Sequence, residues 1–479
     1  MHPRVIANAL GAVYAAGGAA MLVPTLYALL TRDGNAVAFA VPSLATLAAG
    51  AAVFFLTRSE RPYVSGRDVF LIVVLGWVGV ATAGSVPFVL SGLMGPVDAF
   101  FESMAGFTTT GASTIGVPEE VPPSILLWRS LSQWAGGIGI VLLFVAVAPL
   151  VGFGAAQLVS AETADPVPDR LTTRITDTAK ILALVYGSLT LGGVVALLLA
   201  GMGPFDAVNH ALTTVSTGGY STRTESIAAF DSLAVELAIT AGMILSGVNF
   251  GLYFRAASGR LSLAVGNVEL LVFLGIIAAS TLMVSASLYT GGASLFSAAR
   301  DALFQSASLL TGTAFATADW KAWSPFCQGL LMLLLTIGGS AGSTSGGLKV
   351  VRVVLLARHA WQQVFKMVHP RAVTLLKFGH RIVPEKLRVA FLGFFFVYVL
   401  ALVAGTLLLT LHGVPLGASF GSIFACINIA GTALGPVGDA SFFAELPASA
   451  KILLTFFMLL GRLELFTVLV ILTPEFWRS

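Results

Sequence analysis

Long apolar runs alternate with short polar connectors along almost the whole chain. A helix needs about 20 apolar residues to cross the roughly 30 Å hydrocarbon core of a membrane. Ten runs approach or exceed that length, and they cover residues 7–30, 37–56, 69–91, 124–150, 176–201, 233–256, 267–290, 325–357, 387–411 and 449–473. The pattern predicts an all-α polytopic membrane protein whose termini lie on the same side, because the number of crossings is even.

Four of the connectors contain a second apolar run that is too short to cross and that leads into a polar segment. Each segment ends thirteen residues after a residue that favours a helix start, namely Asp98, Asp206, Asp301 and Ser422. Laid in register, the segments are Thr108-Thr109-Thr110-Gly111, Ser216-Thr217-Gly218-Gly219, Thr311-Gly312-Thr313-Ala314 and Thr432-Ala433-Leu434-Gly435. A plain turn explains one such segment, whereas four in register indicate re-entrant half-helices that each deliver a polar strand.

The repetition predicts two leading transmembrane helices, residues 1–60, followed by four units of helix, re-entrant half-helix, polar strand and helix. We expect the units at residues 61–157, 158–260, 261–365 and 366–479, with polar strands at 108–113, 216–221, 311–316 and 432–437. Non-helical backbone persists at membrane depth only where protein or water surrounds it. The units are therefore expected to be parallel helix–pore-helix–helix repeats around a shared pseudo-fourfold pore.

The four strands have the composition of a filter for a monovalent cation. Inward-pointing backbone carbonyls can replace the water shell of an ion, and Gly permits the torsions that this requires. The C-termini of the half-helices also favour a cation. None of the strands contains Asp or Glu, which argues against a ring selective for divalent ions. The candidate ion-binding residues are Thr110, Gly111, Gly218, Gly219, Thr313, Ala314, Leu434 and Gly435.

The four strands are unequal. Ala314 stands where the other three units have Gly, and a positive φ at that position would cost about 1 kcal/mol. Either the backbone is less twisted there or the strain is tolerated. The fourth strand also replaces Thr with Ala433 and Leu434. We expect such a ring to discriminate between similar cations less sharply than four identical strands.

Small residues from Gly338 to Gly347 interrupt the predicted eighth span. Because each Gly lowers helix propensity by about 1 kcal/mol, we expect a flexible loop that lines the cavity just inside the filter and is suited to act as a gate. A close helix contact through small residues is the alternative interpretation. The candidate gate residues are Gly338, Gly339, Gly342, Gly346 and Gly347, together with Arg462 in the last span.

Arg462 lies in the middle of an apolar stretch, where a charge is costly unless it faces protein or water. If it projects into the path of the ion, its positive charge raises a barrier to permeation. The alternative is a structural arginine that pairs with a carbonyl or an acid of a neighbouring span. Glu464 is two residues further on, and therefore on another helix face, so it is not the natural partner of Arg462.

Composition and charge support a membrane protein and orient it. Hydrophobic residues make up 57% of the chain and charged residues 10%, with a mean hydropathy of +0.91. Alternate connectors place nineteen Lys and Arg residues on the side of the termini and six on the opposite side, which predicts cytoplasmic termini. Nothing in the sequence supports nucleic-acid binding. A processed signal peptide at the first span is a minor alternative, because that run is too long for a signal-peptide core.

Several stretches resemble the TrkH-type subunits of bacterial potassium uptake systems, in the Trk/Ktr/HKT superfamily. They are TTTGAS from Thr108, QWAGGIGI from Gln133, STGGYS from Ser216, GGSAGSTSGGLKVVR from Gly338, HPRAV from His369, VPEK from Val383 and GRLELFTVLVILTPEFWR from Gly461. The resemblance covers nearly the whole chain. It implies a homodimer in the bacterial cytoplasmic membrane, with one potassium pore in each protomer and a cytosolic nucleotide-binding regulatory ring of the TrkA type.

The resemblance also implies roles for particular residues: Gly111, Gly219 and Gly435 in the filter, 338–347 as an intramembrane gate loop, and Arg462 as the pore arginine. Ala314 departs from the filter pattern, which bears on selectivity for potassium over sodium. No P-loop or Rossmann glycine motif occurs in this chain, so control by a nucleotide would come through the partner. We expect no bound organic cofactor, and potassium as the transported substrate.

The sequence allows three classes of function to be compared: a channel, a coupled transporter and an enzyme. The leading hypothesis is a channel-like pore that moves potassium inward along its electrochemical gradient. A secondary transporter coupled to protons or sodium would require buried titratable groups at the midplane, and only Arg462 and Glu464 lie inside a predicted span. A membrane-embedded enzyme would require a cluster of catalytic side chains within the spans, and the sequence shows none.

Overall fold

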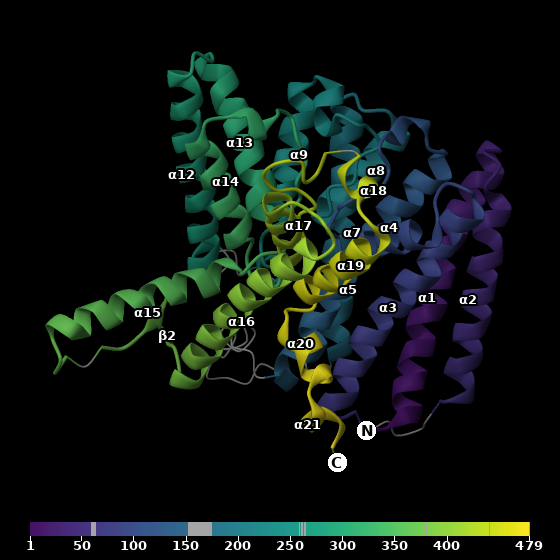
Figure 1. The fold of residues 1–479 in the computed structure, drawn as a ribbon, viewed down its shortest axis with the longest axis horizontal. Coiled ribbons are helices and arrows are strands. Elements are labelled where there is room, and N and C mark those ends of the chain that lie inside the picture. Colours follow the sequence, from purple (N-terminus) through teal and green to yellow (C-terminus); the bar gives the residue numbers. More distant parts are fainter. Residues whose placement is uncertain are drawn as a thin grey trace.

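The computed structural model describes residues 1–58, 64–151, 175–257, 259, 262, 265–372, 374–379, 381–439 and 441–478. Seven helices in these ranges are long and apolar enough to cross a membrane, and the number rises to nine if two sharply bent helix pairs each count as one span. Both termini lie at the same end of the molecule (Figure 1). The predicted unit boundaries near residues 60, 157 and 260 lie outside the described ranges.

Two leading helices, α1 (Pro3–Thr31) and α2 (Ala36–Leu56), form a hairpin beside the remaining helices (Figure 1). Glycines let their backbones approach closely. A Cβ atom at Gly18 would lie 2.5 Å from the backbone nitrogen of Leu47, and one at Gly11 would lie 2.6 Å from that of Phe54. The hairpin is joined to the next helix where the backbone N–H of His2 donates to Asp68 at 2.9 Å.

After the hairpin, the same order of elements occurs four times: a long helix, a short helix, a polar segment and another helix. The long first helices are α3 (Gly66–Leu90), α7 (Ile175–Leu199), α12 (Val268–Thr290) and α16 (Glu385–Thr410). The short helices are α4 (Pro96–Phe107), α8 (Pro204–Val215), α13 (Leu295–Thr311) and α17 (Leu416–Asn428). The last helices are α5 (Pro123–Val151), α9 (Leu233–Ser246), α14 (Pro325–Ile337) and α19 (Ala448–Arg462).

Short elements lie in the connections and after α19. These are η1 (Pro118–Glu120), η2 (Ser226–Phe230), η3 (Trp320–Ala322), α18 (Phe442–Glu445), η4 (Val470–Leu472) and α21 (Pro474–Trp477). Two antiparallel strands of two residues each, β1 (Lys377–Phe378) and β2 (Arg381–Ile382), precede α16. The described part of the chain is otherwise helical or irregular, in agreement with the predicted all-α class.

Three of the ten predicted spans are broken, and only the break in the eighth was predicted from the sequence. The span predicted at 233–256 is α9 followed by α10 (Phe250–Ala257) at an angle of 92°, and that at 449–473 is α19 followed by α20 (Phe466–Leu469) and η4 at 113°. The span predicted at 325–357 ends at Ile337 and resumes after a loop as α15 (Val350–Val368). At the last break, Glu464 and Leu465 have φ angles of 57° and 42°, which a right-handed helix cannot contain.

Helix α15 extends sideways from the other helices (Figure 1). Its first turns are anchored, because Val351 and Leu355 are buried in one cluster with Leu387 and Phe391 at the beginning of α16. Its far end exposes large apolar side chains, including Trp361 and Met367, on a helix that also carries Lys and Arg. In the single chain, these apolar side chains at the far end of α15 are exposed.

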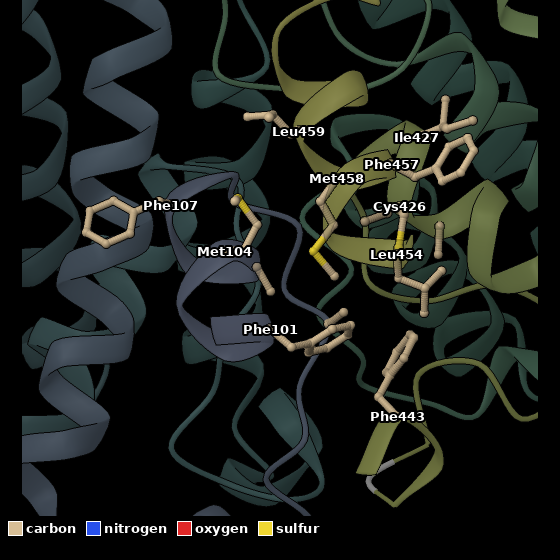
Figure 2. Packing of buried hydrophobic residues seen from close by; sticks show 14 of the residues in the cluster. Phe101, Met104, Phe107, Cys426, Ile427, Phe443, Leu454, Phe457, Met458 and Leu459 are labelled. Carbon is tan, nitrogen blue, oxygen red and sulfur yellow. The ribbon is translucent and has the colours of Figure 1, made fainter. Parts of the chain in front are cut away.

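The first and last units meet along an apolar seam between α4, α17 and α19. Figure 2 shows Phe101 and Met104 of α4 facing Met458 and Leu454 of α19. The ring of Phe101 lies 5.5 Å from that of Phe443, and an ion pair of 2.5 Å joins Lys451 of α19 to Asp98 of α4. This seam brings the end of the chain back to its first short helix and closes the four units into a ring.

Candidate functional site

The backbone repeats one torsion pattern after each short helix. A left-handed residue is followed by one ordinary residue and then by a second left-handed residue. The pairs are Thr109 and Gly111 (φ 55° and 77°), Thr217 and Gly219 (53° and 76°), Gly312 and Ala314 (73° and 61°), and Ile429 and Gly431 (58° and 61°). Alternation of this kind re-aims successive carbonyl groups, which is the backbone requirement of a carbonyl-lined constriction.

Ala314 therefore has the positive φ that the sequence left open. Alanine in this region costs about 1 kcal/mol relative to glycine, so the strain is tolerated at this position. The branched side chain of Ile429 is under the same constraint. Because non-glycine residues hold these torsions, the surrounding structure must fix them.

The fourth strand has a different register from the one predicted. Gly431, and not Gly435, has the position equivalent to Gly111, and Leu434 lies beyond the repeated pattern. Gly435 is exposed, and nothing lies within 4 Å of where its Cβ would be. The predicted register was counted from Ser422 as the start of the short helix. Ser422 instead lies inside α17, where its hydroxyl group donates to the carbonyl of Ala418, so it does not cap the helix.

The physical spacing runs from the helix start rather than from a polar anchor. Helices α4, α8 and α17 begin at Pro96, Pro204 and Leu416, and the first left-handed residue comes thirteen positions later in each. Helix α13 begins at Leu295, which is about one helical turn further from its first left-handed residue, Gly312, than in the other three units. The residues before the four helix starts are Gly95, Gly203, Ser294 and Pro415, so none of the predicted anchors is an N-cap.

The four strands touch one another in chain order. A Cβ atom added at Gly111 would overlap the carbonyl oxygen of Gly218, and one at Gly219 would overlap that of Thr313. A Cβ at Gly312 would lie 3.3 Å from the carbonyl oxygen of Ile429. One at Gly431 would lie 2.7 Å from that of Thr110, which returns to the first strand. Each strand thus packs on the next, and the set closes into a ring.

A cavity of about 600 Å³ opens above this ring. Five of the predicted ion-binding residues line it, namely Gly111, Gly218, Gly219, Thr313 and Ala314, and Ala430 and Gly431 complete it from the fourth strand. Thr110 is fully buried, with its hydroxyl group 2.8 Å from that of Thr108. The strands therefore surround the floor of one shared vestibule.

Polar contacts tie the units together around the vestibule. Thr224 donates its backbone N–H (2.8 Å) and its hydroxyl group (2.6 Å) to Glu119, and Lys321 pairs with Asp439 at 2.7 Å. Burial acts to raise the pKa of the Glu119 carboxyl group, but the hydrogen bonds from Thr224 outweigh it and leave the pKa below its usual value. Each contact joins neighbouring units, which braces the mouth.

Two acidic or basic side chains of the short helices have local partners. Glu102 is buried in an ion pair with Arg129 at 2.7 Å, and Nε2 of His210 lies 2.9 Å from the hydroxyl group of Ser221. Among the described residues, no group of three or more His, Cys, Asp or Glu side chains is arranged to hold a metal ion. Both side chains are therefore held by protein partners.

The glycine-rich loop is buried and held by hydrogen bonds, which differs from the flexible loop predicted. The N–H of Ser340 donates to the carbonyl of Gly247 at 2.9 Å, and that of Ala341 to Glu269 at 2.7 Å. The carbonyl of Gly342 accepts from Phe250 at 3.1 Å. Glycine raises the freedom of an isolated loop, but buried polar backbone is bonded whenever partners are near.

Glycines also permit close packing of the loop beneath the strands. A Cβ at Gly347 would lie 2.7 Å from Cα of Gly338, so the two ends of the loop cross in contact. One at Gly339 would lie 2.7 Å from Cβ of Ser345. One at Gly346 would overlap the carbonyl oxygen of Asn428, at the end of α17. The loop therefore packs directly against the fourth strand's helix.

Arg462 is 2% exposed and binds the loop. One terminal nitrogen donates to the carbonyl of Thr344 and the other to that of Gly136 in α5, both at 2.9 Å. Glu464 does not pair with Arg462 and instead pairs with Arg352 at 2.5 Å, from the break that follows α19 rather than from a helix face. The contacts match the alternative interpretation of an arginine bound to carbonyls, and they also connect it to the loop.

Comparison with known proteins assigns the architecture. The family profile described as "TrkH: Cation transport protein" matches residues 36–260 and 257–478. The chain belongs to the TrkH family. It is a transport protein of the membrane rather than an enzyme. The fold is similar along the whole chain to that of a solved relative, the potassium transporter TrkH from Vibrio parahaemolyticus, with a TM-score of 0.92 and 37% identity over 100% of both chains.

Relatives of known function align over the full length. The Trk system potassium uptake protein TrkH of Escherichia coli strain K12 is 39% identical over 487 residues, with 100% of both chains covered. The Trk system potassium uptake protein TrkG of the same strain is 32% identical, with 100% of this chain and 99% of TrkG covered.

Proposed function

We propose that this member of the TrkH family takes up potassium across the bacterial cytoplasmic membrane. The observation that carries the proposal is the closed contact of four strands with matching backbone torsions beneath one vestibule. Carbonyl oxygens of the strands would replace the water shell of the ion. The names of the full-length relatives support potassium as the substrate.

The buried loop and Arg462 would form the gate. The loop lies against the helix that delivers the fourth strand, and Arg462 holds its Thr344 carbonyl. A positive charge at that depth opposes a permeating cation. Conduction therefore requires the loop and the guanidinium group to move together, so we treat them as one gate.

The transport would be channel-like and driven by the membrane potential, which supplies about 2.3 kcal/mol per charge per 100 mV. The test uses purified protein in liposomes with an imposed potential and no proton or sodium gradient. Potassium flux under these conditions is the expected result. Flux that appears only with a proton or sodium gradient would establish coupled transport instead.

Selectivity is measured in the same liposomes as the permeability ratio of potassium, rubidium and sodium. The unequal strands, with Ala314 in the third, predict preference for potassium over sodium that is weaker than in a ring of identical strands. A very high potassium preference would contradict the effect of the unequal strands. Equal passage of sodium and potassium would refute the assignment of potassium uptake.

Regulation would come from partners: a second copy of the chain and a cytosolic nucleotide-binding ring of the TrkA type. The basic connector 349–388, which includes α15 and its exposed Trp361 and Met367, is the proposed docking surface. A pull-down with the full chain and with the connector removed tests this. Loss of the ring with the connector is expected, and retention would show that the basic charges only orient the protein.

A further inference from the structure

One face of α5 carries a buried polar network that reaches the first two strands. Arg129 and Gln133 are four positions apart, so they project from the same face of the helix. The guanidinium group of Arg129 lies 4.0 Å from the ring centroid of Tyr220, over its face, and pairs with Glu102. The Tyr220 hydroxyl group is 3.1 Å from the carbonyl of Ala112, in the first strand.

Gln133 is the member of this network that binds strand backbone directly. Its Nε2 donates to the carbonyl of Gly218 at 2.7 Å, and its Oε1 accepts from the N–H of Tyr220 at 3.1 Å. The side chain is 0% exposed. One amide therefore fixes both ends of the Gly218–Tyr220 stretch, including the peptide unit that carries the left-handed Gly219.

The amide also occupies the seam between the first and second strands. A Cβ atom at Gly218 would collide with the Gln133 side chain, and one at Gly111 would lie 3.6 Å from its Nε2. The carbonyl oxygen of Gly218 thus has Gln133 as a hydrogen-bond donor and Gly111 as its packing neighbour. Gln133 therefore lies beside the direct contact between the first and second strands.

The other strand boundaries are held differently. The second and third units are joined by backbone bonds from Ile227 and Ala228 to the carbonyl of Ala316, and the third and fourth by Lys321 and the carbonyl of Val437. Within the part of the chain that the structure describes, no other side-chain amide bonds to the backbone of 109–112, 217–220, 312–315 or 429–432. The pair of hydrogen bonds made by the Gln133 amide is therefore specific to the boundary between the first and second strands.

We propose that Gln133 is a positioning residue for ion selectivity. By bonding both sides of Gly219 and by holding the Gly218 carbonyl beside the first strand, it sets the size of the ring at that boundary. The inference rests on the proposed passage of potassium through the four strands. A sodium ion gains from any loosening of the ring, because the oxygens can then close around a smaller ion.

The test compares Gln133→Leu and Gln133→Glu with the wild-type protein in liposomes, with potassium and sodium flux measured in parallel. Leu keeps an apolar bulk and removes both hydrogen bonds, whereas Glu keeps the acceptor for Tyr220 and replaces the donor to Gly218. We expect the sodium-to-potassium flux ratio to rise about tenfold in both, a change equivalent to about 1.4 kcal/mol. A merely structural role would lower both fluxes in proportion and leave the ratio unchanged.

Gln328→Leu is the matched control, because the Gln328 amide also donates to two carbonyls, those of Lys321 (2.7 Å) and Trp323 (2.9 Å), outside the strands. Its flux ratio should equal that of the wild type. An unchanged ratio in a folded Gln133→Glu or Gln133→Leu protein would overturn the proposal. A wild-type protein that fails to prefer potassium would instead overturn the proposed function, so the two failures are distinguishable.

Discussion

At the scale of single residues, Gly111 and Gly92 share a left-handed backbone and differ in what surrounds them. Their φ angles are 77° and 74°. A Cβ at Gly111 would overlap the carbonyl oxygen of Gly218, whereas nothing lies within 4 Å of one at Gly92. Replacement by Ala therefore separates torsional strain from steric overlap.

We expect Gly92→Ala to cost about 1 kcal/mol of stability and to leave selective flux intact. Gly111→Ala should abolish potassium-selective flux, because the first and second strands must separate to accept the methyl group. Melting temperature and liposome flux of the two variants provide the comparison. Equal flux in both would mean that the contact of Gly111 with Gly218 has no part in permeation.

The corrected register of the fourth strand makes a second paired prediction. A Cβ at Gly431 would lie 2.6 Å from the backbone nitrogen of Ala112, whereas Gly435 is exposed with open space around it. Gly431→Ala should therefore impair selective flux strongly, and Gly435→Ala should lower stability by only about 1 kcal/mol. Rubidium uptake measures both variants. If Gly435→Ala impairs uptake more than Gly431→Ala does, the register predicted from the sequence is correct.

Arg462 makes a third prediction. Arg462→Ala removes a positive charge from the proposed path and frees the carbonyls of Thr344 and Gly136, so potassium flux should rise. Arg462→Lys retains the charge but lacks the planar fork that reaches both carbonyls, and should give an intermediate flux. Initial uptake rates at equal amounts of reconstituted protein decide the matter. An unchanged rate in Arg462→Ala would remove this residue from permeation and leave it a structural role.

At the scale of elements, an ion pair joins the short helix of the third unit to the last helix of the second. Arg300 of α13 binds Glu236 of α9 through two nitrogens, at 2.5 and 2.6 Å, and the Glu236 side chain is 6% exposed. Because a buried carboxylate without its partner is costly, Arg300→Met should lower the free energy of unfolding by about 3 kcal/mol.

The double variant Arg300→Met with Glu236→Gln removes the uncompensated charge and should recover most of that loss. Thermal unfolding in detergent measures all three proteins. If Arg300→Met melts at the wild-type temperature, the pair does not secure the boundary between α9 and α13. If the double variant melts as low as the single one, the cost comes from lost packing of the Arg300 side chain.

At the scale of the whole molecule, the excess of basic residues predicts that both termini face the cytoplasm. The native Cys327 and Cys426 are 0% exposed, so introduced cysteines can be labelled selectively. Glu120→Cys, in an exposed turn beside the vestibule, should react with an impermeant thiol reagent in intact cells. Arg478→Cys should react only after the membrane is opened. The opposite pattern would invert the assigned orientation.

Much of the architecture could be predicted from the sequence because its causes are local. The long apolar runs predict α1, α2, α3 and the other straight spans to within a few residues, since lipid requires a minimum apolar length. The candidate strands in the first three units were also located by local signals, short apolar helices followed by Thr and Gly. The small residues of 338–347 likewise marked the break after α14.

The sequence alone determined that this chain crosses a membrane, that four short helices lead into polar strands, and that a helix is broken by glycines. Only the tertiary structure decided the register at Gly431, the bonded state of the loop and the role of Gln133 as a link. The physical reason is the distance along the chain over which each effect acts. Helix length and glycine torsions act within a few residues, whereas Gly431 contacts Thr110 and Gln133 contacts Gly218, residues that only the closed ring of units brings together.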